Sequence, residues 1–482
     1  MKSLSEYKIR VETLGCRLNQ IESEGAAHFF VQKGFSSDTT PVSSVVKEDT
    51  DTVLCIINTC SVTQKAEQKA RRIIRLVLKK YQNASVIVTG CYAQLRPEEI
   101  KKMDKRISVL KGQLKSRLTQ IPEMLEGFLK GEKWNAEKFS DLLDINLFCL
   151  PQEKTDTPEN SFLLATDSFI AHSRSSLKIQ DGCNNNCSYC TIHMARGNSV
   201  SLNVQSVIER VKALENKGMA EVVFTTVNIA HYRGEYEGEY LNFSRMLRLV
   251  LDATQKIRIR ISSIYPEIVD DEFCDVIKDS RVCPHFHISV QSGSDKILSL
   301  MERHYNRNDV IEACKKIRSV KENPFLACDI ITGFPGETDS DFEETLDLCR
   351  KCGFSWVHAF PFSERPGTKA VLLENKIPQS VSKNRALRLT KWAAESKIDY
   401  IKKCEGKVFP CVVETVRRPK VFAEGKVIYH AVTSNFLHCQ IEVNENTAGN
   451  LSGKLLNVKI EKPLFENITK GGETECTAVL CL

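Results

Sequence analysis

Residues 177–190 read LKIQDGCNNNCSYC, a strand-like segment followed at once by three cysteines, Cys183, Cys187 and Cys190. The sequence therefore predicts closely spaced thiols in a loop at the end of a β-strand. Iron–sulfur clusters are held by cysteine thiolates, usually four for a four-iron cluster. Three cysteines with this spacing can bind three irons and leave the fourth iron open to an exchangeable ligand. A zinc site is the competing interpretation, although zinc knuckles favour paired Cys-x-x-Cys units.

Outward from this loop, residues 171–402 alternate strand-like and helix-like patterns. Six successive β–α units are typical of a doubly wound sheet or of an incomplete barrel, with functional loops at the carboxyl ends of the strands. A long amphipathic helix rich in lysine and arginine is predicted over 380–403. The six predicted strands span residues 177–182, 221–229, 257–264, 285–291, 325–333 and 356–362.

Residues 1–150 form a second region of alternating strands and helices, which predicts a parallel sheet with covered faces. The predicted elements are strands over 7–15, 52–59 and 85–90 and a helix over 64–81. Residues 36–51 are predicted to be an exposed loop, and 151–170 a linker.

Cys16, Cys60 and Cys91 each follow one of these predicted strands. Because the carboxyl ends of parallel strands lie along one edge of a sheet, the three thiols are expected to meet there. Together with the loop at Cys183, they predict a second three-cysteine site. Four further cysteines in apolar or amphipathic segments are expected to be ordinary core residues: Cys55, Cys314, Cys328 and Cys349.

The tail from residue 404 to 482 contains short strand-like segments separated by turns and no helical pattern. It predicts a small antiparallel β-barrel of a kind often used on nucleic acid. Its charges nearly balance, so any RNA contacts there are expected to depend on shape and stacking more than on net charge.

The composition excludes several protein classes. The 482 residues are 42% hydrophobic and 27% charged, which is typical of a globular protein and not of a disordered or fibrous one. No apolar segment approaches the roughly 18 residues of a membrane span, and the start shows no secretory signal, so a cytoplasmic protein without membrane attachment is expected. Nineteen cysteines in such a chain favour metal or redox chemistry over disulfides. The net charge of +6 permits nucleic-acid binding without arguing for it.

The cysteine loop, with Tyr189 just before its third cysteine, resembles that of radical S-adenosylmethionine enzymes. Longer motifs extend over essentially the whole chain and resemble the radical S-adenosylmethionine methylthiotransferases. These motifs are LGCRLNQ (14–20), INTCSVTQKAEQKARRIIR (57–75), TGCYAQ (89–94), CSYCTIHMARG (187–197), RISSIYP (260–266), CPHFHISVQSGSDKILSLMERHYNR (283–307), DIITGFPGET (329–338) and FPFSERPGTKA (360–370).

The resemblance implies an α/β protein of three domains. These are an amino-terminal methylthiotransferase domain with an auxiliary cluster (1–150), a partial (βα)6 radical S-adenosylmethionine barrel (171–403) and a TRAM-like RNA-binding β-barrel (404–482). It also implies two [4Fe-4S] clusters. One, on Cys183, Cys187 and Cys190, binds and cleaves S-adenosylmethionine. The other, on Cys16, Cys60 and Cys91, carries the sulfur.

In such enzymes a deoxyadenosyl radical abstracts hydrogen from C2 of the target adenosine, and a methylthio group is then delivered to that carbon. The protein's task is to hold cofactor and substrate together in a dry pocket. The resemblance implies two partners: the anticodon stem-loop of tRNA, with the target at position 37, and an electron-donating reductase, flavodoxin or ferredoxin.

The family acts on isopentenyladenosine or threonylcarbamoyladenosine in tRNA, or on an aspartate of a small ribosomal subunit protein. Ser61-Val62-Thr63 and HISVQSG (287–293) look more like the threonylcarbamoyladenosine branch. The isopentenyladenosine branch, which tends to carry arginine where this chain has Thr63, stays as the alternative. A third possibility, from a different class, is a non-catalytic RNA-binding protein whose cysteines hold zinc or one structural cluster.

Further candidate cofactor contacts lie near the ends of barrel strands. Arg260, Ser262 and Ser263 end one strand, and Gln291 and Ser292 another, so by position they are expected to face the cofactor ribose or carboxylate. Asp329, a charge in an apolar strand, is either a pocket residue or a core hydrogen-bonding partner. Residues 333–337 (GFPGE) either line the cofactor adenine or only turn the chain.

The chain departs from the family pattern at two positions. Thr226 follows the second barrel strand where the family usually has glycine to receive the methionine amino group, and Leu202 replaces a common arginine. For RNA, the helix over 383–403 and the basic face of the helix over 65–80 are either phosphate contacts or solvated surfaces. That basic face comprises Lys65, Lys69, Arg71, Arg72, Arg75 and Lys79.

Overall fold

The computed structural model describes residues 3–43, 49–148, 161–164, 173–414, 420–422, 426–444 and 451–481. Its contacts divide the chain into two compact units. Unit 1 comprises Met1–Ser168, Lys178–Leu202 and Ser363–Val371, and unit 2 comprises Phe169–Leu177, Asn203–Phe362 and Leu372–Leu482. The loop with Cys183 therefore belongs to the same unit as Cys16. The linker predicted over 151–170 lies outside the described residues except for 161–164.

Unit 1 contains a five-stranded sheet of order β2-β1-β3-β4-β5 in which every pairing is parallel. The three predicted strands are confirmed. Every residue of β3 and β4 is buried, as expected for parallel strands covered on both faces. The strands are β1 (Lys8–Thr13), β2 (Ser36–Asp38), β3 (Thr52–Thr59), β4 (Ser85–Gly90) and β5 (Ile107–Val109).

The prediction of a loop over residues 36–51 is wrong at its start, because Ser36–Asp38 form the edge strand β2 beside β1. This strand is only three polar residues long, so no apolar alternation marks it in the sequence. Residues 44–48 of the predicted loop lie outside the described part of the chain.

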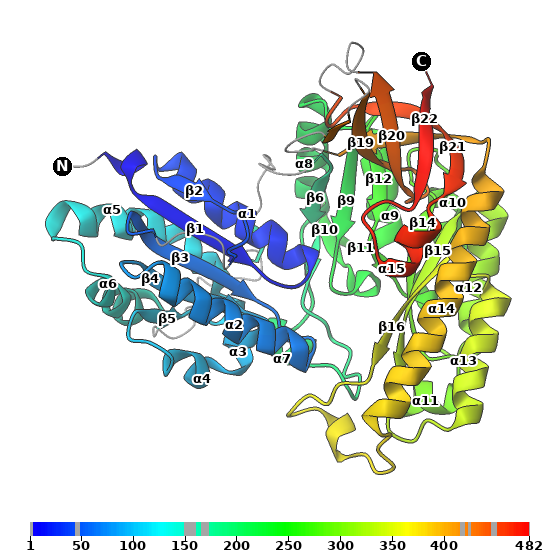
Figure 1. Ribbon diagram of the computed structural model, residues 1–482, viewed down its shortest axis with the longest axis horizontal. Coiled ribbons are helices and arrows are strands. Elements are labelled where there is room, and N and C mark those ends of the chain that lie inside the picture. Colours follow the sequence, from blue (N-terminus) through cyan, green and yellow to red (C-terminus); the bar gives the residue numbers. More distant parts are fainter. Residues whose placement is uncertain are drawn as a thin grey trace. The chain divides into compact units, whose positions relative to one another are not determined.

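Helices cover both faces of the sheet of unit 1. Because side chains alternate between the two faces along a strand, neighbouring residues pack in different hydrophobic cores. Leu54 and Ile56 of β3 pack in the core that includes residues of α1 and α5, whereas Cys55 and Ile57 pack with residues of α2 (Figure 1). The helices are α1 (Arg17–Gln32), α2 (Gln64–Lys80), α3 (Cys91–Leu95), α4 (Pro97–Lys101), α5 (Ile121–Gly131), α6 (Ala136–Leu143) and α7 (Ile192–Arg196).

Unit 2 is built on an open arc of strands whose order is that of a partial (βα)6 barrel, as predicted (Figure 1). The strand predicted over 257–264 is interrupted at Ser262; its first half pairs with β9 and its second half with β14. The strands are β6 (Ser175–Lys178), β9 (Glu221–Thr225), β12 (Arg258–Ile261), β13 (Ser263–Ile264), β14 (His285–Gln291), β15 (Phe325–Thr332) and β16 (Trp356–Pro361).

Helices connect these strands along the chain, as β–α units require. Their apolar faces are buried; in α9, for example, Phe243, Met246, Leu247 and Val250 follow the spacing of one helix face. The main helices are α8 (Val204–Asn216), α9 (Phe243–Ala253), α10 (Asp271–Ile277), α12 (Arg307–Val320), α13 (Asp339–Cys352) and α14 (Gln379–Cys404).

The carboxyl-terminal segment of unit 2 folds as a closed β-barrel of five strands, since β17 pairs with both β21 and β19. One pair, β20 with β22, is parallel, and a short helix, α15 (Phe465–Lys470), lies in the crossover before β22; neither was predicted. The barrel strands are β17 (Val408–Val413), β19 (Lys426–Thr433), β20 (His438–Asn444), β21 (Leu455–Pro463) and β22 (Cys476–Cys481), and β18 (Lys420–Phe422) pairs with β19.

The barrel shares one hydrophobic core with the strands and helix before it. Phe325 of β15 and Ile398 and Ile401 of α14 pack in the same cluster as Val413 and Leu437 of the barrel. The predicted boundary at residue 404 is thus not a boundary between separate cores. No helix in the described ranges is long and apolar enough to cross a membrane.

Candidate functional site

Cys16, Cys60 and Cys91 follow the carboxyl ends of β1, β3 and β4, which are neighbours in one parallel sheet. Parallel pairing therefore puts the three cysteines on one edge, as the sequence predicts. Cys16 is the residue directly before α1, and Cys91 is the first residue of α3. Cys60 and Cys91 are buried, whereas Cys16 is exposed.

Two glycines bring the strand ends into close contact. Gly15 and Gly90, which precede Cys16 and Cys91, have φ values of +99° and +97°. A Cβ on Gly15 would lie 2.4 Å from the Cβ of Cys60 and 2.8 Å from its Sγ, and a Cβ on Gly90 would lie 2.3 Å from the carbonyl oxygen of Thr59. Both positions therefore require glycine, because any side chain would push the strands apart.

The thiols of this site interact electrostatically. Burial raises the pKa of Cys60 to about 11; a hydrogen bond from the backbone of Val62 opposes the rise, and nearby Cys91 and Cys16 add to it. Burial also raises the pKa of Cys91. Iron binding requires thiolates, and the charge of the metal offsets such a rise. Among the described residues no three His, Cys, Asp or Glu side chains lie in a metal-binding arrangement, and this holds for both cysteine sets.

The second cysteine set lies in the loop after β7 (Gln180–Asp181). The amide of Cys183 donates to the carbonyl of Gly197 (3.1 Å), that of Cys190 to Cys187 (3.0 Å), and that of Ile192 to the Sγ of Cys190 (3.4 Å). Cys183 and Cys187 are buried and Cys190 is half-buried. These contacts hold the loop compact, and its donor set of three thiols fits a four-iron cluster with one open iron.

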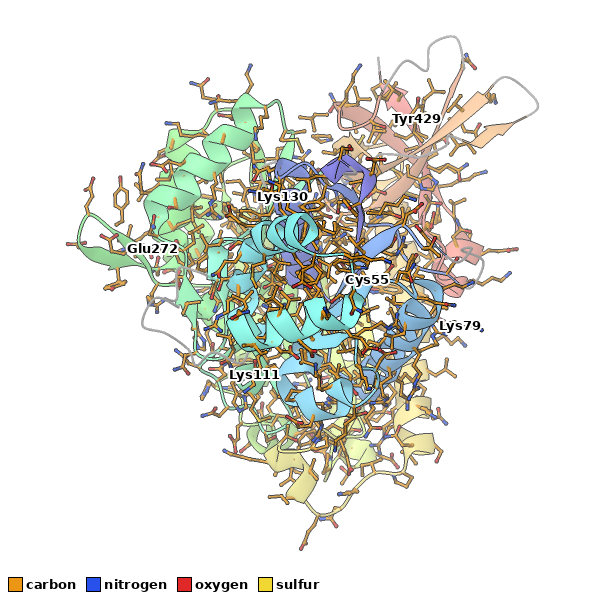
Figure 2. All side chains as sticks on the ribbon, turned by 90° about the vertical axis from the view of Figure 1, so that its left-hand side faces the viewer. Cys55, Lys79, Lys111, Lys130, Glu272 and Tyr429 are labelled. Atoms are coloured by element: carbon orange, nitrogen blue, oxygen red, sulfur yellow. The ribbon has the colours of Figure 1, made fainter. Side chains whose placement is uncertain are left out.

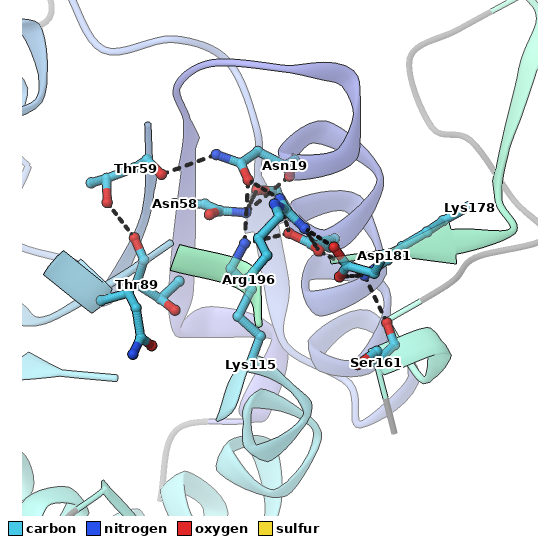
Figure 3. Close-up of polar contacts among 12 residues, drawn as sticks. Asn19, Asn58, Thr59, Thr89, Lys115, Ser161, Lys178, Asp181 and Arg196 are labelled. Carbon is cyan, nitrogen blue, oxygen red and sulfur yellow. Dashed lines mark hydrogen bonds and ion pairs between the residues drawn. The ribbon is translucent and has the colours of Figure 1, made fainter. Parts of the chain in front are cut away.

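A buried network of charged side chains links the parts of unit 1 (Figure 3). At its centre Glu22 of α1 accepts from Lys178 (2.9 Å) and Arg196 (3.0 Å) and pairs with Lys115. Asp181 pairs with Lys178 (2.5 Å) and with Arg196 (2.8 Å). Burial alone would raise the pKa of Glu22, but the three cations hold it well below its usual value, so this carboxyl is ionised at neutral pH.

Sequence reasoning missed this network. Its ion pairs join positions far apart in the chain, which no periodic pattern reveals. One signal was present: Lys178 and Asp181 are charges inside the strand-like segment before Cys183. Charged residues are rarely buried unless they are paired, so such charges point to partners elsewhere in the fold.

A buried arginine contacts Ser61, the residue that follows Cys60. Arg365 donates from Nη2 to the Oγ of Ser61 (2.7 Å) and also pairs with Glu67 of α2. Ser61 in turn donates to Glu67 (2.5 Å). The segment 363–371, which overlaps the FPFSERPGTKA motif (360–370), is in this way fixed within unit 1.

The predicted cofactor role of Arg260 is wrong. Arg260 is only 2% exposed, and its guanidinium pairs with Glu221 at 2.7 and 2.9 Å. Its remaining donors bind the carbonyls of Thr433 and Ser434 in the carboxyl-terminal barrel. The side chain is directed to Glu221, the first residue of β9, and not to the carboxyl ends of the strands, so Arg260 joins the two parts of unit 2.

Ser262 and Gln291 lie where the strand ends were predicted. The Oγ of Ser262 is 3.4 Å from the Oγ1 of Thr226, the residue that replaces the usual glycine. Gln291 ends β14 with a φ of +69°, which is uncommon for a residue other than glycine and is often found at functional sites. Tyr189 is half-buried in the cysteine loop. The cofactor roles of Ser262, Gln291 and Tyr189 stay predictions.

Asp329 of β15 pairs with His287 of β14, with 3.0 Å between Oδ2 and Nε2. Burial alone would raise the pKa of Asp329, but its interaction with His287 lowers it. His358 of β16 lies beside His287, with 5.4 Å between the ring centroids. Three neighbouring strands thus carry one polar cluster, and a pocket role for Asp329 stays a prediction.

The segment 333–337 has the contacts of a tight turn. The carboxylate of Glu337 accepts from the amide of Gly333 (2.6 Å) and from Arg385 of α14 (2.5 Å). A Cβ on Gly333 would lie 1.8 Å from the Oγ of Ser382. These contacts favour the turn over a role in lining the cofactor adenine.

The basic face predicted on α2 is largely confirmed as exposed surface. Arg71 is the exception, because it donates to the hydroxyl of Tyr92 (3.1 Å) and to Glu99 (3.2 Å). Lys79 projects from the outer side of the helix (Figure 2). The other exposed members are Lys65, Lys69, Arg72 and Arg75.

Comparison with known sequences identifies two family regions. The Radical SAM superfamily matches residues 177–349, and the uncharacterized protein family UPF0004 matches residues 8–112. The first region contains the loop with Cys183, Cys187 and Cys190. The second contains Cys16, Cys60 and Cys91, so each cysteine set belongs to one matched region.

Several relatives are similar over most of their length. The threonylcarbamoyladenosine tRNA methylthiotransferase MtaB of Treponema pallidum (strain Nichols) is 41% identical, over 85% of this chain and 91% of that protein. The protein of the same name from Thermotoga maritima is 33% identical, over 98% and 97%. A tRNA-2-methylthio-N(6)-dimethylallyladenosine synthase of Clostridium novyi (strain NT) is 30% identical, over 96% and 95%.

Solved structures agree at the level of the fold. The radical S-adenosylmethionine methyltransferase TsrM of Kitasatospora setae superposes with a TM-score of 0.51 at 12% identity, over 83% of this chain and 76% of that one. The chain itself belongs to the radical S-adenosylmethionine methylthiotransferase family and is most like its threonylcarbamoyladenosine branch.

Proposed function

We propose that this protein adds a methylthio group to C2 of N6-threonylcarbamoyladenosine at position 37 of tRNA, next to the anticodon. The observation that carries the proposal is the presence, in one compact unit, of two separate three-cysteine sets. One set lies in a single loop, and the other converges from three neighbouring strands. Enzymes that only cleave S-adenosylmethionine need one cluster, whereas sulfur insertion needs a second.

Cys183, Cys187 and Cys190 would hold the cluster that binds S-adenosylmethionine, and Cys16, Cys60 and Cys91 would hold the second. When bound, these clusters supply the electron for cofactor cleavage and the sulfur that is transferred. The chain's own residues provide the frame. Gly15 and Gly90 let the second set of thiols approach one another, and backbone hydrogen bonds fix the first set in its loop.

The exposed basic residues of α2 are proposed to contact tRNA phosphates. An electron donor of the flavodoxin or ferredoxin class would deliver the reducing electron, and the cytoplasm, where tRNA is found, would be the site of the reaction. The choice of threonylcarbamoyladenosine is supported by Ser61-Val62-Thr63 and by 41% identity to one relative of that name, compared with 30% identity to a dimethylallyladenosine synthase.

Mass spectrometry of tRNA nucleosides from a deletion strain tests the substrate. We expect the methylthio form of threonylcarbamoyladenosine to disappear while its unmodified precursor remains. Loss of methylthio-isopentenyladenosine instead would reject this substrate in favour of the other tRNA branch. Anaerobic iron and sulfide analysis should give about eight irons per chain, as two four-iron clusters require. A protein that contained zinc and no iron would exclude the proposed enzymatic activity.

The division of labour between the cysteine sets gives a second test. Replacing Cys183, Cys187 and Cys190 with alanine should abolish deoxyadenosine formation, because no iron remains to bind the cofactor. Replacing the other set should keep deoxyadenosine formation and eliminate the methylthio product, because the two sets assemble on different elements. If this second variant folds yet forms no deoxyadenosine, the assignment of separate sites fails.

A further inference from the structure

The buried network of unit 1 extends to residues that lie beside both cysteine sets in the sequence. Figure 3 shows its hydrogen bonds among Asp181, Arg196, Asn19, Thr59 and Thr89. Arg196 ends the short helix α7 that follows Cys190. Its Nη2 donates to the Oδ1 of Asn19 (2.8 Å). The Nδ2 of Asn19 then donates to the carbonyls of Leu14 (2.8 Å) and Thr59 (3.0 Å). Thr59 directly precedes Cys60, and Leu14 lies two residues before Cys16, so one amide connects two of the strand ends.

The third strand end joins the same path. The Oγ1 of Thr59 donates to the carbonyl of Thr89 (2.5 Å), two residues before Cys91, and the amide of Ala93 donates to that Oγ1 (3.4 Å). Asn58 fixes Asn19 from the other side by donating to its backbone carbonyl (3.0 Å). The three strand ends that carry Cys16, Cys60 and Cys91 are therefore held in register by a few buried amides and hydroxyls.

The network also has an unbalanced charge. Its cations are Lys115, Lys178 and Arg196, and its carboxylates are Glu22 and Asp181, which leaves one positive charge in excess. All five side chains are buried or nearly so, with Asp181 the most exposed at 11%. An excess buried charge is unfavourable unless a group of opposite sign lies nearby.

The thiols of the strand-end site are the candidates for that group. Helix α7, which ends with Arg196, packs against α3, whose first residue is Cys91. Arg196 also interacts electrostatically with Cys91 and Cys16. A four-iron cluster on three thiolates is anionic and becomes more so on reduction, and nearby charge is one of the properties that set its potential. The single excess positive charge therefore stabilises an anionic cluster at this edge, and it stabilises the more negative reduced form more than the oxidised form.

We infer that Arg196 and Asn19 are positioning residues that couple the two cysteine sites. Asn19 holds the strand ends, and Arg196 ties them to the loop that would bind S-adenosylmethionine. The positive charge of Arg196 also raises the reduction potential of the cluster on Cys16, Cys60 and Cys91. The inference rests on the proposed function, because it concerns how the two proposed clusters are set against each other.

Three variants separate the effect of the positive charge of Arg196 from that of its paired hydrogen bonds. Arg196→Gln removes the charge and the hydrogen-bonding guanidinium. Arg196→Lys keeps the charge but loses the planar guanidinium, which contacts Asn19 and Asp181 together. Arg106→Gln is the matched control. Arg106 pairs with Asp104 and donates to three backbone carbonyls. It directly precedes β5, so it lies at the opposite edge of the same sheet.

The first readout is the reduction potential of the strand-end cluster, measured by electron paramagnetic resonance in a protein whose Cys183, Cys187 and Cys190 are replaced by alanine. This measurement needs no tRNA. Arg196→Gln should change the ratio of reduced to oxidised cluster at least tenfold toward the oxidised form, which is 59 mV for a one-electron couple. Arg196→Lys and Arg106→Gln should leave the ratio within threefold of its starting value.

The second readout is coupling in the full protein, measured as deoxyadenosine formed per methylthio product. Both Arg196 variants should raise this ratio several-fold, and the Arg106 variant should not. If the reduction potential is unchanged in Arg196→Gln, or falls as much in Arg196→Lys as in Arg196→Gln, the charge of Arg196 does not set the potential of the cluster. If Arg196→Gln does not fold, an unchanged coupling ratio in Arg196→Lys overturns the positioning role. Failure of the proposed function is distinct, because the unaltered protein would then form no methylthio product.

Discussion

Replacing Gly15 with alanine tests the close packing of the strand ends. Its φ of +99° lies in a region that disfavours side chains, which costs on the order of 1–3 kcal/mol. The new Cβ would also lie 2.4 Å from the Cβ of Cys60, well inside the normal separation, and overpacking adds about 1–3 kcal/mol. Loss of chain flexibility in the unfolded state returns about 0.4–1 kcal/mol. We therefore expect Gly15→Ala to lower the free energy of unfolding by roughly 2–5 kcal/mol.

The matched control is Gly127→Ala in the interior of α5. No heavy atom lies within 4 Å of a Cβ built there, so this change should stabilise the protein by about 0.5–1 kcal/mol. Urea unfolding of iron-free protein, followed by circular dichroism, compares the two variants. The iron content after anaerobic reconstitution gives an independent reading, since a displaced Cys60 should reduce it from about eight toward four irons per chain.

The two substitutions should thus have opposite signs. If Gly15→Ala were as stable as Gly127→Ala and bound the full complement of iron, Gly15 would not be packed closely against Cys60. A loss of stability with full iron binding would contradict the expected link between this packing and the binding of iron by Cys60.

Three further predictions concern other parts of the molecule. Cys55→Ala should lower stability by about 1–2 kcal/mol, measured by thermal unfolding, and leave iron content and activity unchanged, because Cys55 is fully buried within β3. The pKa of Glu221 is lowered to about 2, chiefly by Arg260 against the opposing effect of burial, so its contribution to stability is complete above its usual pKa near 4.5 and is lost as the pH falls toward 2. Glu221→Gln should accordingly destabilise the protein at neutral pH. The difference in urea-unfolding midpoint between the unaltered protein and this variant should become smaller as the pH falls, and a constant difference would contradict the assignment. Reversing the charge of Arg75 and Lys79 on α2 should weaken tRNA binding and reduce its salt dependence in filter-binding assays, whereas Lys130→Glu on α5, away from that basic face, should change neither.

The strands were predicted best from the sequence where they are buried. The ranges 52–59, 85–90 and 285–291 match β3, β4 and β14 residue for residue. The first two are covered parallel strands, which are mostly apolar segments bounded by turns, whereas β14 (HFHISVQ) alternates polar and apolar residues. Short elements were missed. β2 and α15 have only three and six residues, too few for a periodic pattern to appear.

The sequence predicts the cysteines of the candidate site but not the residues that support them. Spacing marks Cys183, and the position after a strand marks Cys16, so local patterns suffice for both. Arg260 and Glu22 depend on partners far away in the sequence. Such partners decide the direction of a charged side chain, and the pattern of a single strand does not reveal them.

The carboxyl-terminal barrel has a consequence for how the protein is made and handled. Its strand β22 lies between β20 and β21, so the barrel closes only when residues 476–481 are present. Because the barrel shares a core with Phe325, Ile398 and Ile401, a fragment that ended at residue 404 would present these apolar side chains to water. Contacts this distant in sequence also form slowly. The catalytic barrel is therefore expected to depend on chaperones during synthesis until its tail is complete, and to aggregate when that tail is trimmed.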